Sequence, residues 1–129
     1  MKLLLDTHVL LWWLRDDRRL GQRARAVIAD SRATVLASIA SGWEISVKSR
    51  IGKIVESGAP VMREAVEQGF QIVGLTGDHL AALEALPRIN GHGDPFDQLL
   101  LAQALVEDAV LMTGDRSMSN YGVPCIGVA

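Results

Sequence analysis

The sequence predicts an α/β domain with a central parallel sheet of about five strands flanked by helices. Short apolar runs rich in leucine and valine alternate along the chain with segments that have helical periodicity. Strands and helices that alternate in this way form βαβ units, in which helices cover both faces of a parallel sheet. The 129 residues are 49% hydrophobic, which is enough to bury one core. We therefore expect a single domain over residues 1–129.

Each predicted strand is a short apolar run bounded by polar or turn-forming residues. The strands are expected at residues 2–6, 34–37, 71–75, 110–113 and 125–128. The last of these follows Pro124, which favours an edge position because proline has no backbone N–H to donate to a neighbouring strand.

The helices are predicted from apolar periodicity and from residues that commonly start or end a helix. They are expected at residues 7–14, 21–29, 38–51, 61–68, 78–85 and 95–106. The first helix follows its strand with almost no loop, with Asp6 or Thr7 as its N-cap. Gly58-Ala-Pro60 is expected to interrupt the chain before the fourth helix, and residues 87–93 to form a loop rich in proline, asparagine and glycine.

Composition narrows the compartment and the class of partner. The single cysteine, Cys125, excludes an intramolecular disulfide and a metal–thiolate cluster, so a reducing cytoplasm is the simplest expectation. No apolar run is long enough to span a bilayer, and we expect no membrane partner. The segment from Arg15 to Lys53 contains nine basic and four acidic residues, a local charge of +5 in a chain of net charge −2. This segment is either an ordinary solvated helical face or a stripe that follows phosphates.

Four carboxylates are predicted to gather at the carboxyl edge of the sheet: Asp6, Glu44, Asp97 and Asp115. Acids that meet at this edge form a pocket of hard oxygen ligands, which suits Mg²⁺ or Mn²⁺ bound against a phosphate. Divalent ions in such a pocket neutralise a phosphodiester, activate a water and stabilise the departing oxygen. The pattern therefore favours a metal-dependent phosphodiesterase, in particular a ribonuclease.

Each acid taken alone also has a structural explanation. Asp6 and Asp94 stand where helix N-caps are expected, and Asp115 follows a glycine as a turn residue does. Asp97 falls at the third position of the helix that Asp94 would cap, where the helix dipole favours an acid. Glu44 lies four residues before Lys48, the spacing of an ion pair along a helix. Only the set of acids points to a metal site.

Four motifs in order along the chain resemble those of PIN-domain ribonucleases, in particular the VapC-like toxins of bacterial type II toxin–antitoxin pairs. They are Leu-Leu-Leu-Asp6-Thr-His, Ser41-Gly-Trp-Glu44-Ile with Lys48, His92-Gly-Asp94-Pro-Phe-Asp97, and Leu111-Met-Thr113-Gly-Asp115. The resemblance spans essentially the whole chain. It implies a Mg²⁺- or Mn²⁺-dependent endoribonuclease with a five-element parallel sheet. It also implies a homodimer, or a toxin–antitoxin hetero-oligomer in which a cognate antitoxin protein keeps the enzyme inactive.

The resemblance also implies roles for individual residues. The catalytic and metal-binding quartet would be Asp6, Glu44, Asp97 and Asp115. Supporting roles would fall to Asp94, Thr7 and Thr113. The expected contacts to the RNA substrate are Lys48, Arg50, Arg116 and His92. The family often has a basic residue directly after the threonine, whereas this chain has Gly114 there.

Two other functions share these sequence features. A non-catalytic binding module would use the acids as helix caps and the apolar first helices as a docking surface. A structure-specific DNA nuclease would use the same acidic site on a different nucleic acid. Assays of whether the Mn²⁺-loaded protein binds and cuts RNA or flapped DNA distinguish the ribonuclease, the binding module and the DNA nuclease.

Overall fold

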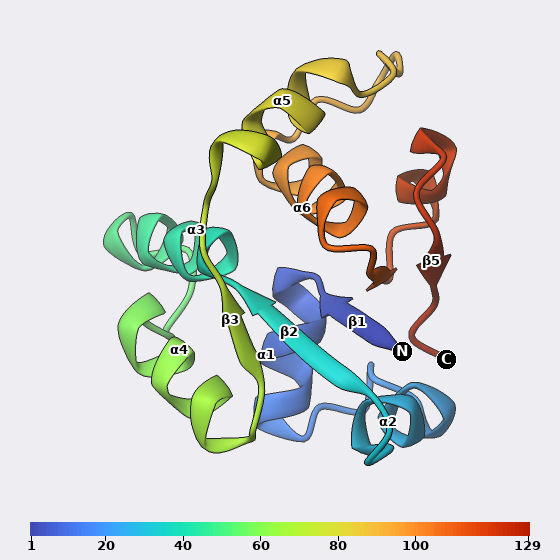
Figure 1. Ribbon diagram of the computed structural model, residues 1–129. Coiled ribbons are helices and arrows are strands. Elements are labelled where there is room, and N and C mark those ends of the chain that lie inside the picture. The colour runs from blue at the N-terminus through green and yellow to red at the C-terminus, as the bar shows by residue number, and fades with distance from the viewer.

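The computed structural model describes residues 1–129 and contains a five-stranded, wholly parallel sheet (Figure 1). The strands are β1 (Lys2–Leu5), β2 (Thr34–Ser38), β3 (Gln71–Val73), β4 (Val110–Met112) and β5 (Cys125–Ile126). Their order across the sheet is β3-β2-β1-β4-β5. The predicted fold class is confirmed.

Six α-helices and one 3₁₀-helix pack around this sheet. They are α1 (Thr7–Arg15), α2 (Gln22–Ala29), α3 (Ile39–Arg50), α4 (Gly58–Glu67), α5 (Gly77–Ala85), α6 (Pro95–Val106) and the 3₁₀-helix η1 (Arg116–Tyr121). Helices α1, α2 and α4 lie on one side of the sheet, and α6 lies on the other (Figure 1). None of the helices combines the length and the apolar character that crossing a membrane requires.

The leucines of β1 connect two hydrophobic cores. Leu3 and Leu5 pack with α1, α2 and α4, whereas Leu4 packs with α6 and η1 on the opposite face. All three are fully buried. Successive side chains of a strand point to opposite faces, so a central strand covered on both sides is apolar at every position. The consecutive leucines of the sequence are explained by this position.

Two local expectations about the helices were wrong or incomplete. Helix α4 begins at Gly58, not at residue 61, so Gly58-Ala-Pro60 forms its first turn instead of a break. Proline is tolerated there because the first N–H groups of a helix have no acceptor within it. The helix η1 was not predicted; its one 3₁₀ segment is too short to give a periodic signal.

Helix α3, which carries Glu44, packs closely on α4 through two glycines. A Cβ on Gly58 would collide with the carbonyl oxygen of Gly42 and the hydroxyl of Ser46. A Cβ on Gly42 would lie 2.9 Å from Cγ of Met62. The close approach of the two helices therefore requires that both positions lack a side chain.

A buried polar network ties α6 to the carboxyl ends of β2 and β3. Gln103 of α6 hydrogen-bonds the Ser38 hydroxyl and donates to the carbonyl of Gly74 at 3.2 Å. Nδ1 of the fully buried His79 accepts the backbone N–H of Thr76 at 3.1 Å. The remaining ring nitrogen, 3.0 Å from a Glu107 oxygen, therefore carries the proton of a neutral imidazole. The network fixes where the N-terminus of α6 reaches the edge of the sheet.

Alanine at Gly58 is expected to lower the free energy of unfolding by about 1–3 kcal/mol, because overpacking forces α3 and α4 apart. Gly77 is the matched control: it is also the first residue of a helix, and a Cβ there meets nothing within 4 Å. Gly77→Ala should leave the protein unchanged or stabilise it by roughly 0.4–1 kcal/mol. Urea unfolding measures both variants, and equal stability of the two would contradict the close packing of α3 on α4.

Candidate active site

A pocket of about 370 Å³ at the carboxyl edge of the sheet contains all four predicted acids. Asp6 follows β1, Asp115 lies beyond β4, Glu44 comes from α3 and Asp97 from the first turn of α6. The full lining is Asp6, His8, Trp12, Arg19, Glu44, Lys48, Asp94, Asp97, Gly114 and Asp115. One of these ten residues is hydrophobic, so the pocket suits a charged ligand.

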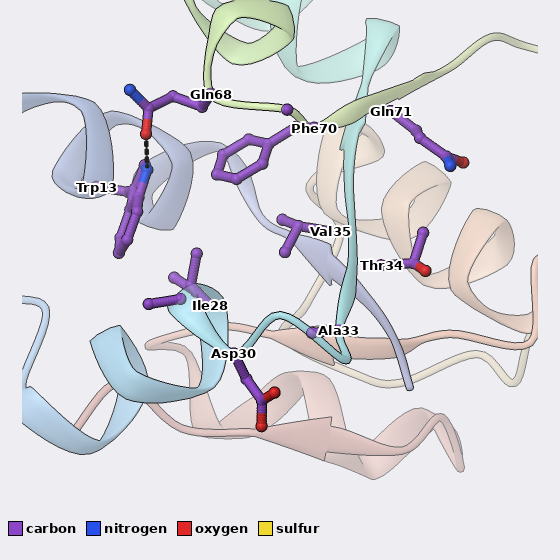
Figure 2. A pocket seen from close by; sticks show the side chains of 11 residues that line it. Trp13, Ile28, Asp30, Ala33, Thr34, Val35, Gln68, Phe70 and Gln71 are labelled. Atoms are coloured by element: carbon purple, nitrogen blue, oxygen red, sulfur yellow. Dashed lines mark hydrogen bonds between the residues drawn. The ribbon is translucent and has the colours of Figure 1, made fainter.

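A second groove, at the amino-terminal ends of β2 and β3, is chemically different (Figure 2). It has about 340 Å³ and is lined mainly by apolar side chains, among them Ile28, Val35 and Phe70. The indole N–H of Trp13 donates to Oε1 of Gln68 at 3.0 Å across its mouth. With one acid, Asp30, this groove has no set of ligands for a metal ion.

Asp6 is held rigidly at the start of α1. Its Oδ1 accepts the backbone N–H of Val9 at 2.9 Å, and its own N–H donates to the carbonyl of Met112 at 3.0 Å. The side chain is buried, and this burial raises its pKa, while hydrogen bonds from Thr113 and Val9 lower it. Asp6 is both an N-cap and a pocket acid.

Both carboxylate oxygens of the buried Glu44 are engaged. Oε1 lies 2.7 Å from the Thr7 hydroxyl, which in turn lies 2.9 Å from the hydroxyl of Ser41. Oε2 accepts from Nζ of Lys48 at 2.6 Å. The hydrogen bond to Glu44 raises the pKa of Lys48. The ion pair between Glu44 and Lys48 that the sequence suggested is therefore present. The contact of Lys48 with RNA stays a prediction.

Asp97 lies among like charges with little to compensate them. Asp94 caps α6 by accepting the N–H groups of Phe96 and Asp97 at 2.8 and 3.4 Å. Burial, followed by the charges of Asp94, Asp6 and Glu44, raises the pKa of Asp97 to about 6, and only His92 lowers it. Such crowding is what a bound cation relieves.

His92, which sequence analysis assigned to substrate contact, approaches the acids from the loop before α6. Its Nε2 lies 3.5 Å from Oδ2 of Asp97 and 3.8 Å from Oδ2 of Asp115, while Nδ1 lies 2.6 Å from the Tyr121 hydroxyl. Nε2 is buried and has no hydrogen-bond partner. His92, Asp97 and Asp115 offer ligand atoms within 4.8 Å of one another. The position fits a role beside the acids better than a surface contact.

Asp115 and Thr113 form a turn at the end of β4. Oδ1 of Asp115 accepts the N–H and the hydroxyl of Ser117 at 2.9 and 2.6 Å, which caps η1. These hydrogen bonds lower the pKa of Asp115. The Thr113 hydroxyl accepts the N–H of Asp115 at 3.1 Å and also hydrogen-bonds Asp6. Thr113 therefore connects two of the acids.

Five of the nine basic residues between Arg15 and Lys53 are paired with acids. The pairs are Arg15–Glu56, Arg19–Asp17, Arg25–Asp16, Arg32–Asp30 and Lys48–Glu44. Two of the nine, Arg19 and Lys48, line the acidic pocket. Arg50 and Arg116 do not line the pocket. Any contact that they make with RNA would therefore lie outside it.

Four pocket residues were not among the candidate site residues of the sequence analysis: His8, Trp12, Arg19 and Gly114. The helical spacing of His8 and Trp12, four residues apart, places them on one face of α1, and this spacing was the available signal. Arg19 lies in the turn after α1 and gives no periodic signal.

The donor set fits a hard divalent cation. Carboxylate oxygens from four elements face one cavity, which no thiolate lines, and the imidazoles of His8 and His92 lie nearby. Asp6 and Asp97, whose pKa values are raised by burial, are the groups whose ionised forms gain most from a bound cation.

Comparison with known proteins agrees with this geometry. The PIN domain family model matches residues 3–124. Ribonuclease VapC22 of Mycobacterium tuberculosis is 30% identical over 123 residues, which are 94% of this chain and 92% of that protein. The structure of VapBC2 from Rickettsia felis, bound to a DNA fragment from their promoter, aligns with a TM-score of 0.75 at 13% identity and covers 100% of both chains.

A toxin–antitoxin complex from Klebsiella pneumoniae aligns with a TM-score of 0.58 at 20% identity over 87% of this chain and 85% of that one. At such identities the two structures show a shared fold. The family model spans nearly all of the sequence, and the relative at 30% identity does the same. The chain therefore belongs to the PIN-domain family.

Proposed function

We propose that this protein is a Mg²⁺- or Mn²⁺-dependent endoribonuclease, a VapC-like toxin neutralised by a cognate antitoxin. The observation that carries the proposal is the group of acids in one pocket, of which Asp97 has a pKa raised to about 6 by burial and by its acidic neighbours. The 30% identity to a ribonuclease supports RNA as the substrate.

Asp6, Asp97, Asp115 and Glu44 would hold the divalent cation, which when bound neutralises the phosphodiester and supplies an activated water. The chain positions these acids through its own hydrogen bonds. Thr113 orients Asp6, and the backbone of α1 fixes it at 2.9 Å. Thr7 and Lys48 hold the two oxygens of Glu44. Preorganised ligands of this kind do not have to reorganise when the substrate arrives.

The alternative of a non-catalytic binding module has one observation in its favour. Asp6, Asp94 and Asp115 do cap helices, as that interpretation requires. Capping does not account for Asp97, which caps nothing and lies within the repulsive field of three other acids. Asp97 lies in the first turn of α6, where the helix dipole favours an acid, but burial and the neighbouring acids still raise its pKa to about 6. Repulsion that outweighs this structural benefit indicates a ligand site, so the nuclease is favoured.

The partners proposed are an RNA substrate, an antitoxin protein and a second copy of the chain in a homodimer or a toxin–antitoxin hetero-oligomer. The shared fold with a chain of a toxin–antitoxin complex supports the antitoxin. Helix α3 and its C-cap residue Ile51 also expose four large apolar side chains spaced four residues apart: Ile39, Trp43, Val47 and Ile51. A contiguous apolar stripe of this kind is typical of a surface that contacts another protein. We propose that the protein acts in the cytoplasm.

Asp97→Asn is expected to lower RNA cleavage by on the order of a hundredfold or more, because it removes a charge from the centre of the pocket. Asp78→Asn is the matched control: Asp78 also lies in the first turn of a helix but is exposed and outside the pocket. Gel assays of a mixed structured and single-stranded RNA with Mn²⁺ measure both variants. EDTA should stop the wild-type enzyme, and flapped DNA serves as the competing substrate.

Cleavage by Asp97→Asn at the rate of Asp78→Asn would remove Asp97 from the mechanism. Cleavage that persists in EDTA would contradict metal dependence. A marked preference for flapped DNA at matched salt would favour the DNA nuclease.

Asp97→Asn is also expected to stabilise the metal-free protein at neutral pH. The pKa of Asp97 is about 6 in the folded chain, above the value of about 3.9 expected when unfolded, so the folded state binds more protons between these values. Stability contributed by protonated Asp97 is therefore lost as pH rises from about 4 to about 6. At neutral pH the free energy of unfolding of the variant should exceed that of the wild type by about 1–2 kcal/mol. Near pH 4 the two free energies of unfolding should be about equal.

Thermal unfolding in EDTA at several pH values measures this difference, with Asp78→Asn as the control. Added Mn²⁺ should reverse the order, because a cation that binds the folded wild type stabilises it by mass action. A wild type more stable than Asp97→Asn in EDTA at neutral pH would show that Asp97 is not destabilised by its acidic neighbours.

A further inference from the structure

The side chains of Arg19 and Trp12 form a cation–π pair on the wall of the acidic pocket. Cζ of Arg19 lies 5.1 Å from the centroid of the Trp12 ring, and both residues line the pocket with the acids. The indole edge also packs near Gly114, where a Cβ would lie 3.6 Å from the ring. A cation and an aromatic ring thus stand beside carboxylates in one cavity.

The plane of the Arg19 guanidinium is fixed by Asp17. Nε and Nη2 of Arg19 donate to the two oxygens of Asp17 at 3.1 and 2.7 Å, and the backbone N–H of Arg19 donates to the same carboxylate at 2.9 Å. Arg25 holds this turn from beneath: Nη2 donates to the carbonyl of Asp17 at 2.5 Å, and Nε to that of Leu20 at 2.8 Å. The guanidinium is therefore preorganised.

Much of the Arg19 side chain is open to solvent. It is 63% exposed, although its Cζ lies over the indole of Trp12 and Asp17 accepts from two of its nitrogens. A planar guanidinium stacks on nucleobases as an aromatic ring does, and unpaired bases of RNA are commonly held in this way. Because Asp17 already occupies two donors and balances the charge, the exposed part of the guanidinium suits a base better than a phosphate.

We propose that Arg19, backed by Trp12, is a stacking platform for an unpaired nucleobase of a single-stranded RNA whose phosphate lies among the acids. This inference rests on the proposed ribonuclease function. It assigns to the α1–α2 turn a role in holding the substrate and explains why a paired arginine is kept on the wall of an acidic pocket.

The chain contains a matched comparison for Arg19. Arg32 pairs with Asp30 through the same contacts, with Nε and Nη2 donating at 3.1 and 2.9 Å and the backbone N–H at 2.9 Å. Arg32 lies outside the acidic pocket and has no aromatic ring beneath it. The aspartate–arginine turn alone is therefore a local structure, and the position over Trp12 distinguishes Arg19.

The test compares the binding of a short single-stranded oligoadenylate with that of an abasic oligonucleotide of the same length, by fluorescence anisotropy with Ca²⁺ in place of Mn²⁺. Wild type and Arg32→Lys should prefer the base-bearing oligonucleotide by roughly 5- to 100-fold, the range for stacking of one base. Arg19→Lys keeps the charge but loses the plane, so its preference should fall severalfold. Its affinity for the abasic oligonucleotide should match that of the wild type.

A full preference retained in Arg19→Lys would overturn the platform. So would equal weakening of both oligonucleotides by Arg19→Gln with none by Arg19→Lys, which would show a phosphate contact instead. Wild-type protein that binds neither oligonucleotide, or both equally, would also overturn it. Failure of the ribonuclease proposal is read separately, since a protein that stacks bases normally but cuts no RNA in Mn²⁺ contradicts only the proposed activity.

Two adjacent tryptophans give a second comparison. Trp12 lies under Arg19, whereas Trp13 faces the other groove, where it bonds Gln68 (Figure 2). Trp12→Leu should reduce the preference for the base-bearing oligonucleotide, and Trp13→Leu should not, with folding checked by circular dichroism. An equal response of the two folded variants would contradict a role for Trp12.

Discussion

Repulsion among clustered carboxylates is the constraint on which the geometry of this edge of the molecule depends. Acids from four elements share one cavity, and burial together with neighbouring charges raises the pKa of Asp97 to about 6. Folding must hold these groups together against their mutual repulsion. The fold does so with neutral hydrogen bonds from Thr7, Thr113 and the N-terminus of α1, and with one cation, Lys48. These contacts keep the acids in place without cancelling all of their charge.

The same backbone geometry serves structure and site at once. A helix that starts directly after a parallel strand presents its free N–H groups at the carboxyl edge, and an acid there is stabilised as an N-cap. Asp6 and Asp115 use this device, whereas Asp94 caps α6 at the end of the loop that follows α5. The structural and the functional interpretations of these acids are therefore compatible. Asp97 distinguishes them, because the repulsion of its acidic neighbours outweighs the benefit of its first-turn position in α6.

The fold and the four acids could be predicted because their signals are local. Consecutive apolar residues in Leu3, Leu4 and Leu5 reveal a strand covered on both faces, and the carboxyl ends of parallel strands lie at one edge. The first turn of α4 was missed because the rule that glycine and proline end a helix competes with their tolerance at its start. Arg19 could not be placed, since its position depends on how Asp17 and Arg25 fold the turn beneath it. The place of His92 depends likewise on Tyr121, which is distant in sequence.

The sheet order has a consequence for the chain during its synthesis. Strand β1 pairs with β2 on one side and, through Leu3 and Val110, with β4 on the other. A nascent chain that ends before α6 contains Asp6 and Glu44 but lacks Asp97 and Asp115, and the central strand has one open side. The pocket is complete only after Asp115, which lies beyond β4, has left the ribosome. The order in which the strands emerge therefore delays assembly of the acidic cluster during translation.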